Sequence, residues 1–148
     1  MIKQLEDYEI TEVMDLWLKT TITAHSFIPE KHWIDRYDMV KDEYLPISRT
    51  WIFKEDNLIK GFLSIINNSF IGALFVLEDY QRNGIGKELI NHCKSSYQYL
   101  EVGVYIKNIN AVNFYKHCGF MVTKEQENGD SGVREYIMSW KREMIDVN

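Results

Sequence analysis

The amino-acid sequence predicts one domain of mixed α/β (α+β) structure. Its 148 residues match the length of a single domain that can bury a sizeable core. Some stretches carry apolar residues every three to four positions, which is typical of helices, and others alternate or run continuously, which is typical of strands. In the middle of the chain an apolar run, residues 70–77, leads through a glycine-rich turn into a helical pattern, residues 85–93.

The composition is that of an ordinary soluble protein, with 45% apolar and 26% charged residues. No apolar run approaches the length of a membrane span, and the N-terminus has no signal-peptide core. Two cysteines, Cys93 and Cys118, are too few for a disulfide framework and lack a metal-ligand spacing. We therefore expect a cytoplasmic protein without a metal or a membrane partner, present as a monomer or a homodimer.

The formal net charge of −5 bears on the kind of partner. It argues against a nucleic-acid-binding surface, which is normally basic. It fits a cationic substrate such as an amine, and it is also a charge that many proteins carry for solubility alone.

The N-terminal third predicts a short strand, residues 2–5, and two helices. Asp7 can cap the first helix. The apolar stripe of that helix consists of Ile10, Val13, Met14, Trp17, Leu18 and Ile22. The helix is expected to end in the β-branched run before Phe27. Pro29 suits the first turn of a second helix, which Pro46 brings to an end.

The rest of the chain predicts six strands and two more helices. The pairs Asp56-Asn57 and Asn67-Asn68 favour tight turns between strands. After the helix at 85–93, residues 111–118 form a short helix that Gly119 ends. The expected strands are Arg49–Glu55, Leu58–Ile66, 69–77, Tyr99–Tyr105, 120–127 and 133–141.

The glycine-rich turn, Gln81-Arg82-Asn83-Gly84-Ile85-Gly86-Lys87, has the chemistry of a phosphate site. The first N–H groups of a helix have no intrahelical partner, and the helix dipole adds positive charge at the same place. Glycine lets an anion approach the backbone closely. Arg82 and Lys87 add side-chain charge.

Three known phosphate-binding loops share these features. A Walker loop needs Ser or Thr after its lysine, and Glu88 stands there. A dinucleotide fingerprint needs a third glycine where Leu89 stands. The pattern Gln-x-x-Gly-x-Gly, met by Gln81, Gly84 and Gly86, resembles the pyrophosphate loop of the GNAT family of acetyl-CoA-dependent N-acetyltransferases. An ordinary glycine-capped turn is the alternative.

Residues 108–120 resemble a second GNAT signature, Asn-x-x-Ala-x-x-Phe/Leu-Tyr-x-x-x-Gly-Phe. The run that contains Trp17, His25 and Phe27 is similar to a branch of small bacterial GNAT proteins. The resemblance implies a mixed, largely antiparallel central sheet flanked by about four helices. It also implies that strands 70–77 and Tyr99–Tyr105 run parallel and splay apart around the pantetheine arm of the cofactor.

The resemblance implies acetyl-CoA as co-substrate. In the family, loop N–H groups hold the pyrophosphate, and a backbone edge pairs with the pantetheine amides like an added strand. An N–H near Val76 is placed to polarise the thioester carbonyl. Asn108 either bonds the pantetheine arm or caps a helix. The expected cofactor-binding residues are Phe75, Val76, Gln81, Arg82, Asn83, Gly84, Ile85, Gly86, Lys87 and Asn108.

Tyr115 matches the family tyrosine that acts as general acid. A phenol has a pKa near 10, so it remains protonated beside a departing thiolate. The alternative is a core aromatic whose hydroxyl bonds the backbone. Neither cysteine is required: Cys93 occupies an apolar helix position, which argues for a buried, inert thiol, and the signature does not call for Cys118.

The first two helices flank the acceptor side of the cleft in the GNAT fold. Candidate acceptor residues there are Trp17, His25, Phe27, Trp33 and Tyr37. For the aromatic residues the alternative is a place in the core, and for His25, which lies off the apolar stripe at the expected helix end, it is a surface or capping role. Glu135, on a late strand, is expected at the same end of the cleft. The general base is left open between His25, Glu135 acting through water, and bulk solvent.

The sequence thus predicts an enzyme that transfers acetyl from acetyl-CoA directly to an amine of a small molecule, peptide or protein. A non-catalytic acyl-CoA-binding or sensing module on the same fold is the alternative, and Tyr115 favours the enzyme. A phosphate-loop nucleotide hydrolase is disfavoured because Glu88 follows the loop lysine.

Overall fold

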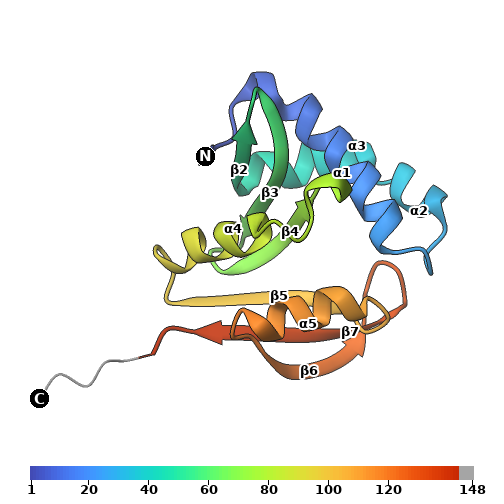
Figure 1. Ribbon diagram of the computed structural model, residues 1–148. Helices are drawn as coiled ribbons and strands as arrows, with labels where there is room; N and C mark the ends of the chain where they lie inside the picture. Colours follow the sequence, from blue (N-terminus) through green and yellow to red (C-terminus); the bar gives the residue numbers. More distant parts are fainter. Residues whose placement is uncertain (144–148) are drawn as a thin grey trace, which may run out of the picture.

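A computed structural model describes residues 1–143 and contains one seven-stranded sheet in the order β1-β2-β3-β4-β5-β7-β6 (Figure 1). The strands are β1 (Ile2–Gln4), β2 (Arg49–Glu55), β3 (Leu58–Ile66), β4 (Phe70–Val76), β5 (Tyr99–Tyr105), β6 (Met121–Glu127) and β7 (Arg134–Lys141). The α-helices are α1 (Ile10–Ala24), α2 (Glu30–Ile34), α3 (Tyr37–Met39), α4 (Ile85–Lys94) and α5 (Ile109–His117). This confirms the mixed α/β class.

Every neighbouring pair of strands is antiparallel except β4 and β5, which run parallel. Their ladder contains only the pairs Phe70–Glu101 and Ile71–Val102. From Gly72 onward β4 is hydrogen-bonded to β3 alone, so its other edge faces β5 across a gap. Figure 1 shows the two strands diverging. The predicted parallel, splayed pair is confirmed.

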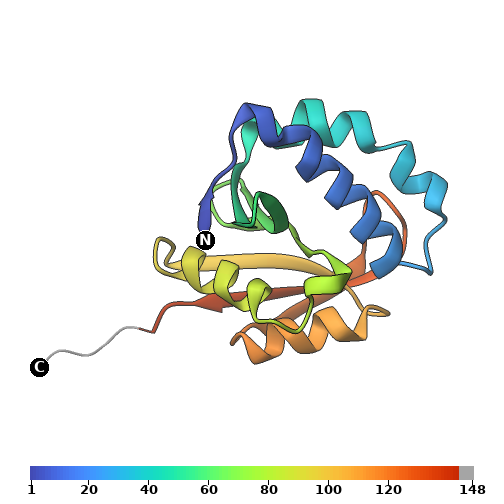
Figure 2. The ribbon, with the colours of Figure 1, turned by 45° about the horizontal axis from the view of Figure 1, so that its top comes forward.

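The sheet separates two hydrophobic clusters. On one face α4 packs on β2, β3 and β4 and α5 packs on β5, with Leu89, Cys93, Leu100, Val102 and Val112 among the buried residues. On the other face α1 and α2 cover β3 and β4. Figure 2 shows α4 and α5 close to each other and α1 with the following helical segment apart from them. The longer helices, α1, α4 and α5, therefore each bury one apolar stripe against the sheet.

The predicted turns have the expected backbone chemistry. Asp56 and Asn57, between β2 and β3, have φ values of 53° and 63°. Asn67 and Asn68, between β3 and β4, have φ values of 52° and 70°. Two consecutive left-handed residues form the tight hairpin turn whose twist matches that of the strands, and Asn and Asp tolerate this conformation best among non-glycine residues.

The start of the first helix differs from the prediction. A 3₁₀ turn, η1 (Asp7–Glu9), precedes α1, and Asp7 lies inside it rather than capping the helix. Glu6 is the N-cap of this turn and forms a capping box with Glu9, whose carboxylate accepts from the Glu6 backbone N–H. The prediction missed this because glutamate is an uncommon N-cap.

The predicted second helix is broken into α2, α3, a π-helical turn η2 (Val40–Tyr44) and a 3₁₀ turn η3 (Leu45–Ile47). At the first break the Arg36 guanidinium donates to the His32 carbonyl at 2.9 Å, while the Arg36 backbone N–H bonds Trp33. The side chain thus takes the carbonyl that an unbroken helix would offer to that N–H. The break directs Arg36 toward the β6–β7 loop.

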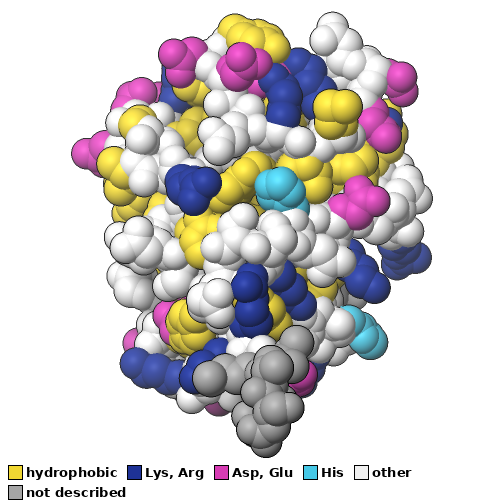
Figure 3. Space-filling model, turned by 90° about the vertical axis from the view of Figure 1, so that its left-hand side faces the viewer, with side chains coloured by type: hydrophobic (Ala, Val, Ile, Leu, Met, Phe, Trp, Pro, Cys, Tyr) yellow, Lys and Arg dark blue, Asp and Glu magenta, His cyan; other side chains and the backbone are white. Residues whose placement is uncertain are grey.

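The surface carries acidic, basic and hydrophobic side chains in a mixed distribution on the face shown in Figure 3. No helix within residues 1–143 has the length and apolar character needed to cross a bilayer.

Candidate active site

A cavity of about 550 Å³ occupies the region where β4 and β5 diverge. Its walls include residues 70–75 of β4 and 102–105 of β5, which extend from the end of the paired part into the gap. Residues from α1 close one side, and Asn108, Ala111 and Tyr115 close the other. Residues expected to serve the cofactor and residues expected to serve the acceptor therefore share one cavity.

The glycine-rich turn forms an uncapped helix N-terminus. Gly84 is the N-cap of α4 with φ of 82°, and no side chain bonds the first N–H groups of the helix. A Cβ added at Gly84 would meet no atom within 4 Å, so the approach to these N–H groups is open. Arg82, Asn83 and Lys87 are exposed around them. This arrangement fits a pyrophosphate group.

The Gln81 side chain braces the loop against the preceding strand. Its Nε2 donates to the Val76 carbonyl at 3.0 Å, which fixes the path of the chain as it leaves β4. Ile85 is buried against Gly61 of β3, whose added Cβ would lie 3.1 Å from the Ile85 side chain. These contacts give Gln81 and Ile85 a role in holding the loop in place.

Gly86 has a packing role. A Cβ added there would lie 3.2 Å from the Phe114 ring of α5. Glycine at this position therefore lets α4 and α5 approach each other, and the loop lies close to the helix that carries Tyr115.

The backbone of Phe75 and Val76 borders the gap. Both residues pair with β3 on one side and neither pairs with β5, while the Val76 carbonyl accepts from the Gln81 side chain. Phe75 lies on the cavity wall, and Val76 lies beside the loop. Unpaired strand groups fit the amides of a pantetheine arm, which would add to β4 as an extra strand.

Asn108 is the N-cap of α5. Its Oδ1 accepts from the Ala111 backbone N–H at 3.2 Å, which is the capping role that sequence analysis held as the alternative. The residue also lines the cavity. Because the cap uses only the carbonyl oxygen, the side-chain NH₂ is left to donate to a ligand.

Tyr115 lies in the wall of the cavity and is buried. Its ring packs between Phe114 and Phe120, with centroid distances of 5.2 and 5.3 Å. Burial, and to a lesser degree the neighbouring Cys118, raises the pKa of Tyr115 above its ordinary value. The phenol therefore stays protonated at neutral pH. Within residues 1–143 its hydroxyl has no backbone acceptor, which disfavours the purely structural alternative.

His25 follows the last residue of α1 and is buried in an aromatic cluster. The nearest rings are those of Tyr105 and Trp33, with centroid distances of 5.0 and 5.4 Å. The Thr21 hydroxyl and His25 Nδ1 share a hydrogen bond of 3.2 Å. Burial lowers the pKa of His25 to about 4, against a smaller opposing effect of Thr21. His25 is therefore neutral at pH 7 and a weak base.

The other aromatic candidates divide into two groups. Trp17, Trp33 and His25 line the cavity. Phe27 and Tyr37 do not: Phe27 packs on His25 and Tyr105, and Tyr37 packs on Trp17. Phe27 and Tyr37 thus support the wall from behind.

Glu135 of β7 lines the same cavity and is buried, with 7% of its surface exposed. Gln126 Nε2 donates to its Oε2 at 2.8 Å, and Asn128 Nδ2 donates to its Oε1 at 3.0 Å. Glu135 pairs in register with Tyr105, so both side chains emerge on the face that carries α1.

Several cavity residues were missed by sequence analysis: Thr21, Arg36, Tyr105, Asn128 and Asp130. Arg36 and Asp130 form a bidentate ion pair, and the Tyr105 hydroxyl donates to Ser131 at 3.0 Å. The one feature of the sequence that pointed to this region was the turn-forming composition of the β6–β7 loop, residues 128–133. It gave no indication that Asp130 of this loop pairs with Arg36.

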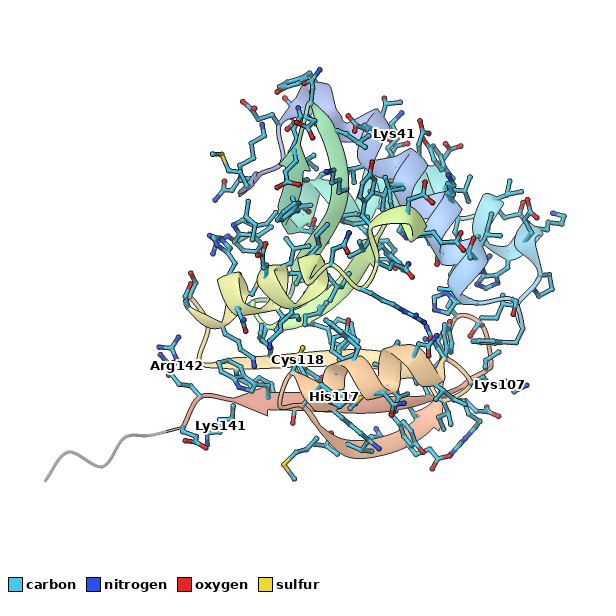
Figure 4. All side chains as sticks on the ribbon, in the orientation of Figure 1. Lys41, Lys107, His117, Cys118, Lys141 and Arg142 are labelled. Atoms are coloured by element: carbon cyan, nitrogen blue, oxygen red, sulfur yellow. The ribbon has the colours of Figure 1, made fainter. Side chains whose placement is uncertain are left out.

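The cysteines are buried and do not line the cavity, although Cys118 neighbours Tyr115. Burial raises the pKa of Cys93 to about 12, and it raises that of Cys118 with Lys94 opposing. Cys118 lies between α5 and α4, where its carbonyl accepts from Lys94 (Figure 4). A thiol with a raised pKa is a poor nucleophile. Residues 1–143 contain no group of three or more His, Cys, Asp or Glu side chains placed to hold a metal ion.

Comparison with known proteins agrees with this geometry. Residues 19–142 match the family model for the acetyltransferase (GNAT) domain. The chain is 34% identical to the peptidyl-lysine N-acetyltransferase YiaC of Escherichia coli K12, over 95% of this chain and 96% of that protein. It is 29% identical to the peptidyl-lysine N-acetyltransferase YjaB of the same organism, over 88% of each chain.

Solved structures share the fold. The solution structure of apo YjaB from Escherichia coli superposes with a TM-score of 0.81, at 26% identity, covering 94% of this chain and 95% of that one. PaiA N-acetyltransferase of Thermoplasma acidophilum, solved with coenzyme A, gives a TM-score of 0.79 at 19% identity, covering 96% and 98%.

The splayed strands, the uncapped loop and the two signatures thus coincide with similarity along nearly the whole chain. The relatives are named as N-acetyltransferases, which favours the enzyme over a non-catalytic module. The chain belongs to the GNAT family of acetyltransferases, whose fold binds acetyl-CoA, and it transfers the acetyl group of acetyl-CoA to an amine.

Proposed function

We propose that this protein acetylates the side-chain amine of lysine in a peptide or protein. The observation that carries the proposal is the shared cavity, in which the open edge of β4 and Tyr115 face the aromatic residues of α1 and α2. The peptidyl-lysine acceptor named for YiaC and YjaB supports it. A lysine side chain has an apolar stem and a terminal amine, which matches an aromatic wall with a carboxylate inside.

The cofactor side of the site is formed by residues expected from sequence. Backbone N–H groups of residues 82–87 hold the pyrophosphate, with charge from Arg82 and Lys87. Gln81 and Ile85 keep the loop in place. The edges of Phe75 and Val76 and the Asn108 amide bind the pantetheine arm, and an N–H near Val76 polarises the thioester carbonyl.

The acceptor side is formed by Trp17, His25 and Glu135, with Phe27 supporting His25 from behind. The acceptor ammonium ion first loses one proton, and the neutral amine then attacks the thioester carbon. The C–N bond forms, the C–S bond breaks, and the nitrogen gives up its second proton to solvent. Tyr115 donates its proton to the departing thiolate and regains a proton from solvent. The net reaction converts an alkylammonium ion and acetyl-CoA into an acetamide, free CoA and one proton.

The experiment is an acceptor screen with the purified protein and acetyl-CoA. Lysine-containing peptides are compared with the same peptides carrying arginine at that position and with small primary amines. We expect free CoA thiol to be released with lysine peptides, and the product mass to increase by one acetyl group on the lysine. Turnover with small amines alone would refute the peptidyl-lysine acceptor and leave the acetyltransferase intact.

We further propose that residues 1–148 form one domain that works in the cytoplasm as a monomer or homodimer. The proposal includes neither a metal nor a nucleic-acid or membrane partner. The net charge of −5 supports the absence of a nucleic-acid surface. Light scattering during size-exclusion chromatography tests the oligomeric state, and activity in the presence of EDTA tests the metal.

A further inference from the structure

Glu135 is a buried carboxylate without a cation. Both of its oxygens accept hydrogen bonds from neutral amides, those of Gln126 and Asn128. Within residues 1–143 no Lys, Arg or His side chain forms an ion pair with it. A buried charge is costly unless a charge of opposite sign compensates it. The position of Glu135 in the cavity wall leaves that compensation to a ligand.

Glu9, which is also buried, differs from Glu135 because it is paired with lysine side chains. Glu9 is 2% exposed and lies within 3.0 Å of Lys3 Nζ and 2.7 Å of Lys54 Nζ. Its charge is neutralised inside the protein, and it joins η1 to β1 and β2. Glu135 has hydrogen bonds that orient it and no such neutralising partner, although the two residues are buried to a similar degree.

The neighbouring strand makes room for this carboxylate. A Cβ added at Gly103 of β5 would lie 2.9 Å from Glu135 Oε1, closer than side-chain atoms normally approach. Glycine at this position therefore lets the carboxylate lie over β5 at the gap between β5 and β4. A side chain from position 103 would project into the same volume.

The surroundings of Glu135 suit a cationic ligand. Tyr105, His25 and Trp33 provide aromatic faces in the same cavity, and such faces attract cations. The other charged and titratable groups that line this cavity are His25, Arg36, Tyr44, Tyr105, Tyr115 and Asp130. His32 also lies 3.2 Å from Asp130. The Arg36 guanidinium is bound to Asp130, and His25 is neutral at pH 7, so neither cancels the charge of Glu135.

We propose that Glu135 binds the acceptor ammonium ion and takes its proton before acetyl transfer. The inference rests on the proposed function for the existence of an amine in this cavity, and it holds for any primary amine. In the step, an N–H bond of the ammonium breaks and its proton passes to a Glu135 oxygen, directly or through one water. The nitrogen keeps the electron pair and attacks the thioester, and it loses its second proton to solvent as the C–S bond breaks. Glu135 later releases the first proton to solvent. Gln126 and Asn128 are positioning residues.

The first test is Glu135→Gln, measured as kcat/KM for the acceptor against pH. Wild type can use the abundant ammonium form, so its kcat/KM should be nearly flat from neutral pH up to the pKa of the amine. The variant depends on free amine, which rises about tenfold per pH unit below an amine pKa of about 10.4. We expect a loss of about 10² to 10⁴ at pH 7 that shrinks as pH rises.

Glu125→Gln, on β6 of the same hairpin, is the matched control because that side chain is exposed and pairs with Arg134. It should retain the wild-type rate and pH profile. Acetyl-CoA affinity should be unchanged in both variants, and Glu125→Gln should also keep the wild-type melting temperature. Unchanged kcat/KM at pH 7 in Glu135→Gln, with a profile parallel to that of wild type, would overturn the inference.

A second variant moves the carboxylate to the other strand. Glu135→Ala alone should be slow, and Gly103→Asp combined with Glu135→Ala should recover part of the rate, because the added side chain enters the vacated volume. Recovery supports a positional role for the charge, and a double variant that binds acetyl-CoA but is no faster than Glu135→Ala counts against it. These measurements use whichever amine the wild type acetylates, so they are separate from the lysine proposal.

Discussion

Arg36 and Asp130, which are 94 residues apart in sequence, are joined by two hydrogen bonds of 2.6 and 2.9 Å. The bidentate pair ties the break after α2 to the β6–β7 loop. Asn128 Oδ1 accepts from the backbone N–H groups of Asp130 and Ser131, so the loop is ordered from within as well. Since Asn128 also donates to Glu135, the ion pair and the buried carboxylate belong to one hydrogen-bonded network.

We predict that Arg36→Ala raises KM for the acceptor and changes kcat and acetyl-CoA affinity little, because the ion pair closes the acceptor side of the cavity. The melting temperature should fall only slightly, since partly exposed ion pairs contribute about 0.2 to 1 kcal/mol. Arg134→Ala, which removes an exposed pair on the same hairpin, is the control. A KM equal to that of wild type would show that the pair does not shape the acceptor site.

The same pair has a defined pH dependence. The hydrogen bond from Arg36 is the main cause that lowers the pKa of Asp130 below its ordinary value of 3.8. Its stabilising effect is therefore present above that value and is lost as the pH falls below it. Urea unfolding of wild type and Arg36→Ala should differ at pH 6 and converge in strong acid.

The pyrophosphate loop is tested by Gly84→Asp with Gly84→Asn as its partner. Both residues tolerate the left-handed conformation of Gly84, and an added Cβ meets no atom within 4 Å. The two side chains have the same shape and differ in charge. We expect acetyl-CoA affinity, measured by calorimetry, to fall much further for aspartate, because its carboxylate faces the phosphates. Equal acetyl-CoA affinities of the two variants would show that the pyrophosphate does not bind at this loop.

His25 makes a separate prediction about stability. Its pKa is about 4 in the folded protein and near 6.5 when unfolded, so between these values only the unfolded chain binds the proton. The free energy of unfolding should therefore be highest above pH 6.5 and fall toward pH 4 by up to about 1.4 kcal/mol per pH unit. His25→Gln should reduce this slope.

The control for that measurement is His117→Gln, because His117 is exposed at the end of α5 (Figure 4). This variant removes an exposed imidazole and leaves His25 in place, so it should keep the wild-type pH dependence. If His25→Gln and His117→Gln show the same slope as wild type, His25 is not the group that senses pH.

The fold was largely predictable because the local sequence patterns favour the same helices, strands and turns that the tertiary packing requires. The turn pairs at 56–57 and 67–68, the alternation in Tyr99–Tyr105 and the stripe of α4 each determine an element without help from distant residues. The helix after Pro29 was predicted less well. Its apolar residues have helical spacing, but the Arg36 side chain bonds the His32 carbonyl and interrupts the helix. The spacing of apolar residues gives no sign of such a hydrogen bond.

The site was predictable only where a local pattern carries the chemistry. Gly84, Tyr115 and Asn108 belong to contiguous signatures, so their places followed from the sequence. The Arg36–Asp130 pair and the fit of Glu135 over Gly103 depend on strand register and on contacts between distant segments. A single sequence has no signal for such contacts.

The role of Tyr115 as general acid is the part of the proposed mechanism that one substitution tests most directly. Its ring is packed by Phe114 and Phe120, so Tyr115→Phe should keep the fold and remove only the hydroxyl. Tyr136→Phe is the matched control, because Tyr136 packs on the same hydrophobic cluster and does not line the cavity. Both variants should melt close to wild type and bind acetyl-CoA normally.

The decisive measurement is kcat of Tyr115→Phe for the acceptor, taken together with acetyl-CoA affinity. We predict a fall of about 10² to 10⁴, the usual contribution of a positioned general acid, with affinity unchanged. The fall can lie at the lower end because a thiolate is already a fair leaving group. A full wild-type kcat in Tyr115→Phe would contradict the account and show that another group protonates the thiolate.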